Sequence, residues 1–205
     1  MSSVPSVSTI YPSAWLSSIA QFLIRRRILI SGLIFAGLIV EDVVTGTQPH
    51  DLANLRDPFA VAGGLLVLTG LALRSWSAGV LHKDKELTTR GPYRLIRNPL
   101  YVGSFLMMFG FCTLIDDPEN LFFILGPVLW LYIVKVRQEE RLLSGRFPQQ
   151  WAEYARTTPR FIPRLNLVDL RSDWRLAQWM RSREYQACGA TLLALVALKI
   201  WHESL

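Results

Sequence analysis

The sequence predicts an all-α, polytopic membrane protein with about five transmembrane helices. Five segments of the 205-residue chain are long, apolar and nearly free of charge, and the charged residues lie between them. The mean hydropathy is positive, at +0.26, and 51% of the residues are apolar. Because helices satisfy their own backbone hydrogen bonds in lipid, apolar segments of this length indicate membrane-spanning helices.

The five expected spans follow one another along the chain. The second contains one charge near its end, Arg74, whose guanidinium is expected to reach the membrane surface. The third and fourth are joined by the short acidic turn 116–120, which predicts an antiparallel helical hairpin. Gly63, Gly64 and Gly70 permit close helix contact, within the chain or between copies of it. The expected spans are residues 28–44, 59–81, 100–115, 121–136 and 187–201.

Residues 168–185 are amphipathic, with tryptophan and leucine alternating with arginine. This pattern is typical of a helix on the membrane surface, or of one packed on the protein's own cytoplasmic face. The chain then divides into three parts: spans one and two in 1–81, spans three and four in 82–165, and the amphipathic helix with span five in 166–205.

The distribution of charge predicts the orientation in the membrane. Basic residues cluster at 25–27, 83–97 and 135–183, whereas the alternate loops are acidic and contain one basic residue, Arg56. The positive-inside rule places the N-terminus and both basic segments in the cytoplasm and the C-terminus outside, in the inner or plasma membrane if the protein is bacterial. Topology and contact with anionic membrane lipids therefore explain the net charge of +6 without a nucleic-acid partner.

The two cysteines do not indicate a metal site or a disulfide. Cys112 and Cys188 each lie in an apolar segment, and neither belongs to a Cys/His spacing pattern. Both are expected to be buried structural thiols.

The first segment with unusual residues is 88–103. The steps Gly91-Pro92 and Asn98-Pro99 break the chain twice, which predicts a structured loop that leads into the third span. Asn98 is expected to cap that helix with Pro99 at its first position, and the free N–H groups there suit an anionic group. Gly103, one turn further on, would let a ligand or a helix approach closely.

The second segment runs from Glu139-Glu140 to residue 164. Paired carboxylates at the end of a span suit an ammonium or a sulfonium group. The alternative is that they form salt bridges with nearby basic residues on a solvated helix end, namely Lys135, Arg137 or Arg141.

Together these motifs resemble the isoprenylcysteine carboxyl methyltransferase family, including its bacterial relatives and the phospholipid N-methyltransferases. The likeness covers roughly residues 83–165. It rests on Gly91-Pro92-Tyr93, on the stretch from Arg97 to Gly103, on Glu139-Glu140, and on Tyr154 followed by Pro159-Arg160-Phe161-Ile162-Pro163.

The resemblance implies a membrane enzyme that uses S-adenosylmethionine without the soluble dinucleotide-binding fold, and the sequence contains no strand–GxGxxG–helix unit. Its methyl acceptor would be lipophilic or a small hydrophobic carboxylate, amine or thiol, and no obligatory protein partner is expected. Arg160, and after it Arg164, would orient an anionic substrate. The residues implied to bind the cofactor are Tyr93, Arg97, Asn98, Pro99, Leu100, Tyr101, Gly103, Glu139 and Glu140.

The chain departs from the family pattern at two places. The family usually has histidine at the position of Asn98, and asparagine keeps the hydrogen bonds but cannot carry a positive charge. The family often has arginine at the position of Thr157, and here Arg156 comes one residue early.

Two other functions fit parts of the pattern. Membrane sterol reductases carry a similar tyrosine, Arg-His-Pro and tyrosine arrangement and bind NADPH, although Glu139 and Glu140 would repel its phosphate. A non-enzymatic membrane scaffold or transporter subunit would instead use Arg74, because a charge at membrane depth is costly. His82, at the end of span two, would be structural or solvated, or a base for an amine or thiol acceptor.

Overall fold

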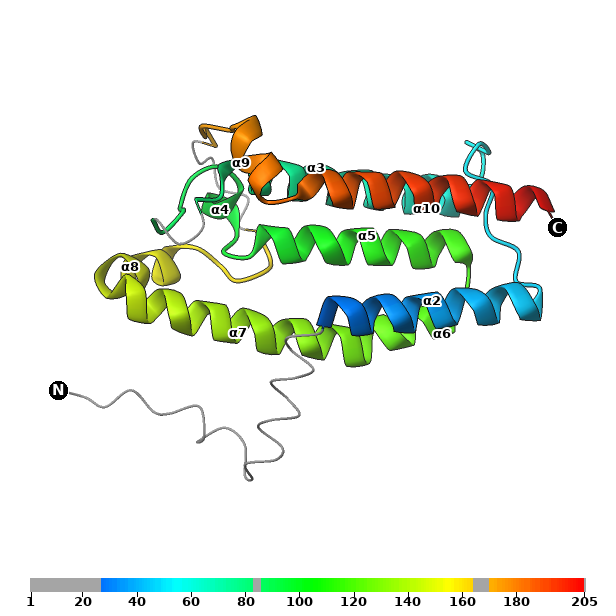
Figure 1. Cartoon of the computed structure of the whole chain (residues 1–205), viewed down its shortest axis with the longest axis horizontal. Coiled ribbons are helices and arrows are strands. Elements are labelled where there is room, and N and C mark those ends of the chain that lie inside the picture. The colour runs from blue at the N-terminus through cyan, green and yellow to red at the C-terminus, as the bar shows by residue number, and fades with distance from the viewer. Residues whose placement is uncertain (1–26, 83–85, 164–169, 205) are drawn as a thin grey trace, which may run out of the picture.

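The computed structural model of the protein describes residues 27–82, 86–163 and 170–204. All regular secondary structure in this part of the chain is helical, which confirms the all-α prediction. Figure 1 shows α2, α3, α5, α7 and α10 with their axes roughly aligned and successive helices running in opposite directions. The described elements are α2 (Arg27–Thr45), α3 (Pro58–Val80), α4 (Pro92–Leu95), α5 (Pro99–Ile115), α6 (Pro118–Phe123), η2 (Ile124–Val128), α7 (Leu129–Arg146), α8 (Pro148–Thr157), α9 (Leu176–Arg181) and α10 (Glu184–Ser204).

Each expected span corresponds to a helix. By length and composition, Pro58–Val80 and Glu119–Arg146 can cross a membrane, with 23 and 28 residues, whereas Pro99–Ile115 is apolar but shorter. Several large side chains on the outer faces are well exposed, such as Leu65 at 59% and Leu193 at 71%, as expected of faces that contact lipid. Five membrane crossings and the orientation of the termini remain predictions.

α3 and α5 pack closely because glycines face each other along their contact. A Cβ atom on Gly70 would lie 2.5 Å from the Gly103 carbonyl oxygen, and one on Gly110 would lie 2.7 Å from that of Gly63. Such close backbone approach requires residues without side chains. Gly63 and Gly70 therefore serve packing within the chain, and Gly103 accommodates a helix.

The fourth expected span contains an irregular turn. η2 is a π-helical turn with Pro127 inside it, between α6 and α7. Proline has no N–H to donate and its ring crowds the preceding turn, so a widened turn relieves the helix at this point. The helical stretch nevertheless continues without a break to Arg146.

The apolar core lies toward the end of the bundle at which α5 ends. Val67, Leu114 and Leu198 pack there from α3, α5 and α10, together with Phe111 and Ile115. At the same end the Asn120 amide nitrogen donates to Asp42 Oδ2 at 2.8 Å and so joins α6 to α2. The motif residues lie at the other end of the bundle.

The amphipathic helix expected over residues 168–185 is wrong for its described part. Residues 170–175 are not helical, α9 has six residues, and Arg183, at φ 56°, separates α9 from α10. A non-glycine residue in the left-handed region interrupts a right-handed helix. Tertiary hydrogen bonds hold the segment on the end of α3 instead, since the Trp174 indole donates to the Ser75 carbonyl at 3.1 Å and the Trp179 indole to the Ser75 hydroxyl at 2.7 Å.

Candidate functional site

Both motif segments meet around one cavity of about 850 Å³. It lies at the end of the bundle where α3 and α7 finish, where α5 begins, and where the short helices α4, α8 and α9 gather (Figure 1). Eight of the residues implied to bind the cofactor line it: Tyr93, Arg97, Asn98, Pro99, Leu100, Tyr101, Glu139 and Glu140. Gly103 packs on Gly70 instead, Arg160 lines a neighbouring pocket, and Arg164 lies outside the described residues.

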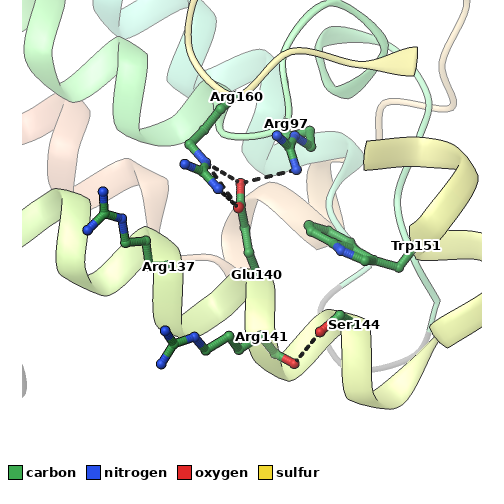
Figure 2. Close-up of a pocket in the computed structure, with 7 residues that line it drawn as sticks. All are labelled: Arg97, Arg137, Glu140, Arg141, Ser144, Trp151 and Arg160. Atoms are coloured by element: carbon green, nitrogen blue, oxygen red, sulfur yellow. Dashed lines mark hydrogen bonds and ion pairs between the residues drawn. The ribbon is translucent and has the colours of Figure 1, made fainter. Parts of the chain in front are cut away.

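Glu140 is the centre of the polar contacts in this region. Its side chain is 9% exposed. Arg160 donates two hydrogen bonds to its Oε2, from Nε at 3.0 Å and from Nη2 at 2.6 Å (Figure 2). Arg97 adds a contact of 3.7 Å to Oε1. Hydrogen bonds to the carboxylate raise the pKa of Arg160 further above its ordinary value. Glu140 thus holds two arginines in place, so the carboxylate that would meet an ammonium group is already paired.

Asn98 precedes α5 as expected but does not cap it with its side chain. The amide nitrogen donates to Glu140 Oε1 at 3.1 Å and to the Arg160 carbonyl oxygen at 3.4 Å. These buried acceptors compete for the amide and draw it away from the start of the helix. The capping prediction is therefore wrong for the side chain, although α5 begins at Pro99.

Glu139 is the more accessible carboxylate of the pair, with its side chain 40% exposed. It accepts a hydrogen bond of 2.9 Å from the Tyr101 hydroxyl and lies 3.6 Å from Lys135, the predicted partner one turn earlier. The Tyr101 ring meets the Tyr132 ring edge-on, with centroids 5.6 Å apart. This end of α7 therefore offers the cavity a carboxylate beside aromatic rings.

Two buried donors that line the cavity have no hydrogen-bond partner in the described part of the chain: the Tyr93 hydroxyl and Arg97 Nε. The Tyr154 hydroxyl donates to the Tyr93 carbonyl oxygen at 2.7 Å, and burial raises the pKa of both phenols. Both rings therefore stay neutral. Buried donors without protein partners are rare, so these two are available to a bound ligand or an ordered water.

Sequence reasoning misread Arg74. The guanidinium does not simply extend to the surface but forms an ion pair with Glu184 at the start of α10, with Nε 2.8 Å from Oε1. It also donates to the Ser104 hydroxyl of α5. All three residues line the cavity. The sequence contained one signal for this ion pair: Arg74 and Glu184 have opposite charges and lie at the same expected end of spans two and five.

His82 also lines the cavity. Its Nδ1 lies 2.9 Å from the Val80 carbonyl oxygen and 3.4 Å from Glu86 Oε1. The ring is therefore held in place at the end of α3.

A smaller pocket of about 350 Å³, shown in Figure 2, adjoins the cavity and shares Arg97, Glu140 and Trp151 with it. Its lining is dominated by arginine and consists of Arg97, Arg137, Glu140, Arg141, Ser144, Trp151 and Arg160.

Comparison with known proteins gives the family. The model of the phospholipid methyltransferase family matches residues 58–150, from α3 to the start of α8. The cobalt-zinc-cadmium resistance protein CzcN of Cupriavidus metallidurans is 30% identical over 171 residues, covering 82% of this chain and 78% of that protein. The chain belongs to the phospholipid methyltransferase family.

Two further relatives are similar to the chain over most of its length. The nickel-cobalt-cadmium resistance protein NccN of Alcaligenes xylosoxydans xylosoxydans is 31% identical, covering 74% of this chain and 71% of that protein. Protein-S-isoprenylcysteine O-methyltransferase B of Arabidopsis thaliana is 24% identical, covering 73% of this chain and 80% of that protein. The predicted resemblance to the isoprenylcysteine methyltransferases is thereby confirmed. No solved structure matches the chain.

The region matched by this membrane-associated methyltransferase family overlaps the residues that line the cavity. The matched region, which contains α3, α5 and α7, supplies most of its walls. Two residues with contacts at the cavity lie beyond the match: Arg160, which forms an ion pair with Glu140, and Glu184, which forms an ion pair with Arg74.

Proposed function

We propose that this member of the phospholipid methyltransferase family transfers a methyl group from S-adenosylmethionine to a lipophilic or small hydrophobic acceptor. The supporting observation is the cavity of about 850 Å³, which brings both motif segments together and contains two buried donors that lack partners. Its volume is within the range of ligand pockets in proteins, roughly 300–1,000 Å³.

The residues present fit the cofactor. The Tyr93 hydroxyl and Arg97 Nε would donate to oxygen atoms such as those of its carboxylate or ribose. Glu139, which faces the cavity beside Tyr101, is better placed than the arginine-bound Glu140 to accept from its ammonium group. Glu140 would act by holding Arg97 and Arg160 in position.

The cofactor, held by Tyr93, Arg97 and Glu139, would supply an electrophilic methyl group carried on a positively charged sulfur, and the acceptor would supply the lone pair. The protein's contribution is then mainly positioning and exclusion of water. A carboxylate acceptor needs no base. An amine or thiol must lose a proton, and His82 is the histidine that lines the cavity.

A lipophilic acceptor fits the other walls of the cavity. Leu81, Leu100, Leu142 and Leu143 line it, and α3 and the α6–α7 stretch that carry part of this lining are long and apolar enough to cross a membrane. In this proposal the acceptor enters from the bilayer and the cofactor from the cytoplasm, where the positive-inside rule places the motif segments.

The test is cofactor binding by calorimetry to the detergent-purified full chain, with S-adenosylmethionine and NADPH in separate titrations. Tyr101→Phe keeps the aromatic ring but frees Glu139 of its hydrogen bond, and Glu139→Gln removes the charge. We expect binding of S-adenosylmethionine, weakened about tenfold, or about 1.4 kcal/mol, by Glu139→Gln. Glu153→Gln, on the exposed face of α8, is the matched control.

Binding of NADPH alone would indicate a reductase instead of a methyltransferase. If neither S-adenosylmethionine nor NADPH binds, the proposal is overturned. Binding of S-adenosylmethionine would then be followed by transfer of a labelled methyl group to extracted membrane lipids. Label in the lipid fraction is the expected result.

A further inference from the structure

The arginine-lined pocket of about 350 Å³, drawn in Figure 2, shares Arg97, Glu140 and Trp151 with the methyl-transfer cavity. Four arginines and one glutamate line it, so its walls carry an excess of positive charge. α7 supplies Arg137 and Arg141, which extend from the same side of that helix, whereas Trp151 comes from α8.

The arginines are of two kinds. Arg97 and Arg160 share the carboxylate of Glu140, which fixes their guanidinium groups. Arg137 and Arg141 are exposed and have no carboxylate partner within the described residues. They lie one helical turn apart, a spacing at which like charges repel each other. The pocket therefore combines two oriented guanidinium groups with two uncompensated ones.

The inner wall of the pocket is rigid. Arg97 lies over the Trp151 ring at 5.6 Å, and its backbone N–H donates to the Pro159 carbonyl oxygen at 2.8 Å. The Glu140 carboxylate and the Trp151 ring therefore hold the Arg97 guanidinium in place at this wall of the pocket.

We propose that this pocket binds the phosphate group of an anionic phospholipid. Guanidinium groups match phosphate oxygens in a two-point geometry, and several converging arginines are a common way to recognise phosphate. The depth also fits, because Arg137 directly follows the apolar residues of the fourth expected span, at the level where head groups lie. Trp151 suits the same interfacial position. The pocket shares Arg97, Glu140 and Trp151 with the methyl-transfer cavity, but Arg137 and Arg141 line this pocket and not the cavity, so lipid binding here can be tested apart from methyl transfer.

The test uses the full chain in a neutral detergent. Binding of a short-chain phosphatidylglycerol is measured by calorimetry for the unmodified protein and for the double variant Arg137→Gln with Arg141→Gln. Both residues are exposed and unpaired among the described residues, so their removal leaves the Glu140 contacts intact. The matched control is Arg156→Gln with Arg175→Gln, which removes two exposed positive charges that do not line the pocket.

We expect the double variant to bind the lipid about tenfold more weakly and the control to bind it as the unmodified protein does. Inorganic phosphate, titrated separately, is expected to bind much more weakly than the lipid. If inorganic phosphate binds as tightly, the ligand is a free phosphate and the head-group assignment is overturned. Equal lipid binding by all three proteins, or equal losses in the variant and the control, would overturn the site itself.

Discussion

Arg74 of α3 and Glu184 of α10 form a two-point ion pair, with Nε 2.8 Å from Oε1 and Nη2 3.0 Å from Oε2. The Glu184 side chain is 4% exposed, and Arg74 also donates to Ser104 of α5. One guanidinium therefore joins three helices beside the cavity. Charges at this depth are stable only when paired, so the pair fixes where α10 begins relative to α3.

Removing one member of this pair should destabilise the protein. Glu184→Gln leaves Arg74 without a counter-charge in a largely buried position, and we expect a loss of about 3 kcal/mol in the free energy of unfolding. The measurement is thermal unfolding in detergent. Replacing both residues with methionine should recover most of the loss, and a double variant no more stable than the single one would show that the pair is not the cause.

Asn98 should be sensitive to charge more than to size. Asn98→Asp preserves the shape but places a carboxylate against Glu140 Oε1, where the amide now donates at 3.1 Å. We expect Asn98→Asp to weaken cofactor binding by more than Asn98→Ala, which loses only the hydrogen bonds, about 1 kcal/mol. Calorimetric titration with S-adenosylmethionine ranks the two variants, and the reverse order would contradict this account.

The glycine contact between α3 and α5 should tolerate no side chain. Gly70→Ala would place a Cβ atom 2.5 Å from the backbone oxygen of Gly103, which forces the helices apart. We expect a loss of about 1–3 kcal/mol of stability. Gly64→Ala is the control, because nothing lies within 4 Å of a Cβ at that position. Equal midpoints of thermal unfolding for the two variants would refute the close contact.

The hydrogen bond from Tyr154 to the Tyr93 carbonyl should stabilise the junction of α4 and α8. Tyr154→Phe leaves a buried carbonyl oxygen without that donor, at a cost of about 1–2 kcal/mol. Tyr185→Phe, at a residue that is 44% exposed, should change little. Chemical unfolding curves of the two variants give the comparison.

Alkaline pH should act on the same pair of phenols. Burial raises the pKa of Tyr93 and Tyr154 above the ordinary value of 10.0, so the folded protein keeps protons that the unfolded chain releases. These two phenols therefore leave stability unchanged below pH 10.0 and lower it as the pH rises above that value. Ultraviolet difference absorbance should show these two tyrosines ionising only on unfolding, and Tyr154→Phe should reduce that late step.

The extent of the helices could be predicted from the sequence because it depends on local composition. The expected span 100–115 became α5 with a difference of one residue at its start, and 59–81 became α3. The Asn98-Pro99 step marked the start of α5, since proline at the first position of a helix is a local signal.

The partners of the polar side chains could not be predicted, because they come from distant segments. Arg160 reaches Glu140 across a loop and a helix, and Asn98 turns toward the same carboxylate instead of capping α5. The single helix predicted over residues 168–185 was wrong for a similar reason. Its alternation of apolar and basic residues has a helical period, but hydrogen bonds to Ser75 and the positive φ at Arg183 determine its conformation.

The π turn at Ile124–Val128 rotates the directions in which the side chains of α7 point. An α-helix advances about 100° per residue, so an additional residue within one turn rotates everything after it by about that angle. Glu139 and Glu140 lie about three turns beyond Val128, on adjacent faces of α7. The winding of the backbone around Pro127 thus sets which face of α7 carries each carboxylate. A one-residue deletion there would move Glu140 toward the present position of Glu139, and Arg141 toward that of Glu140.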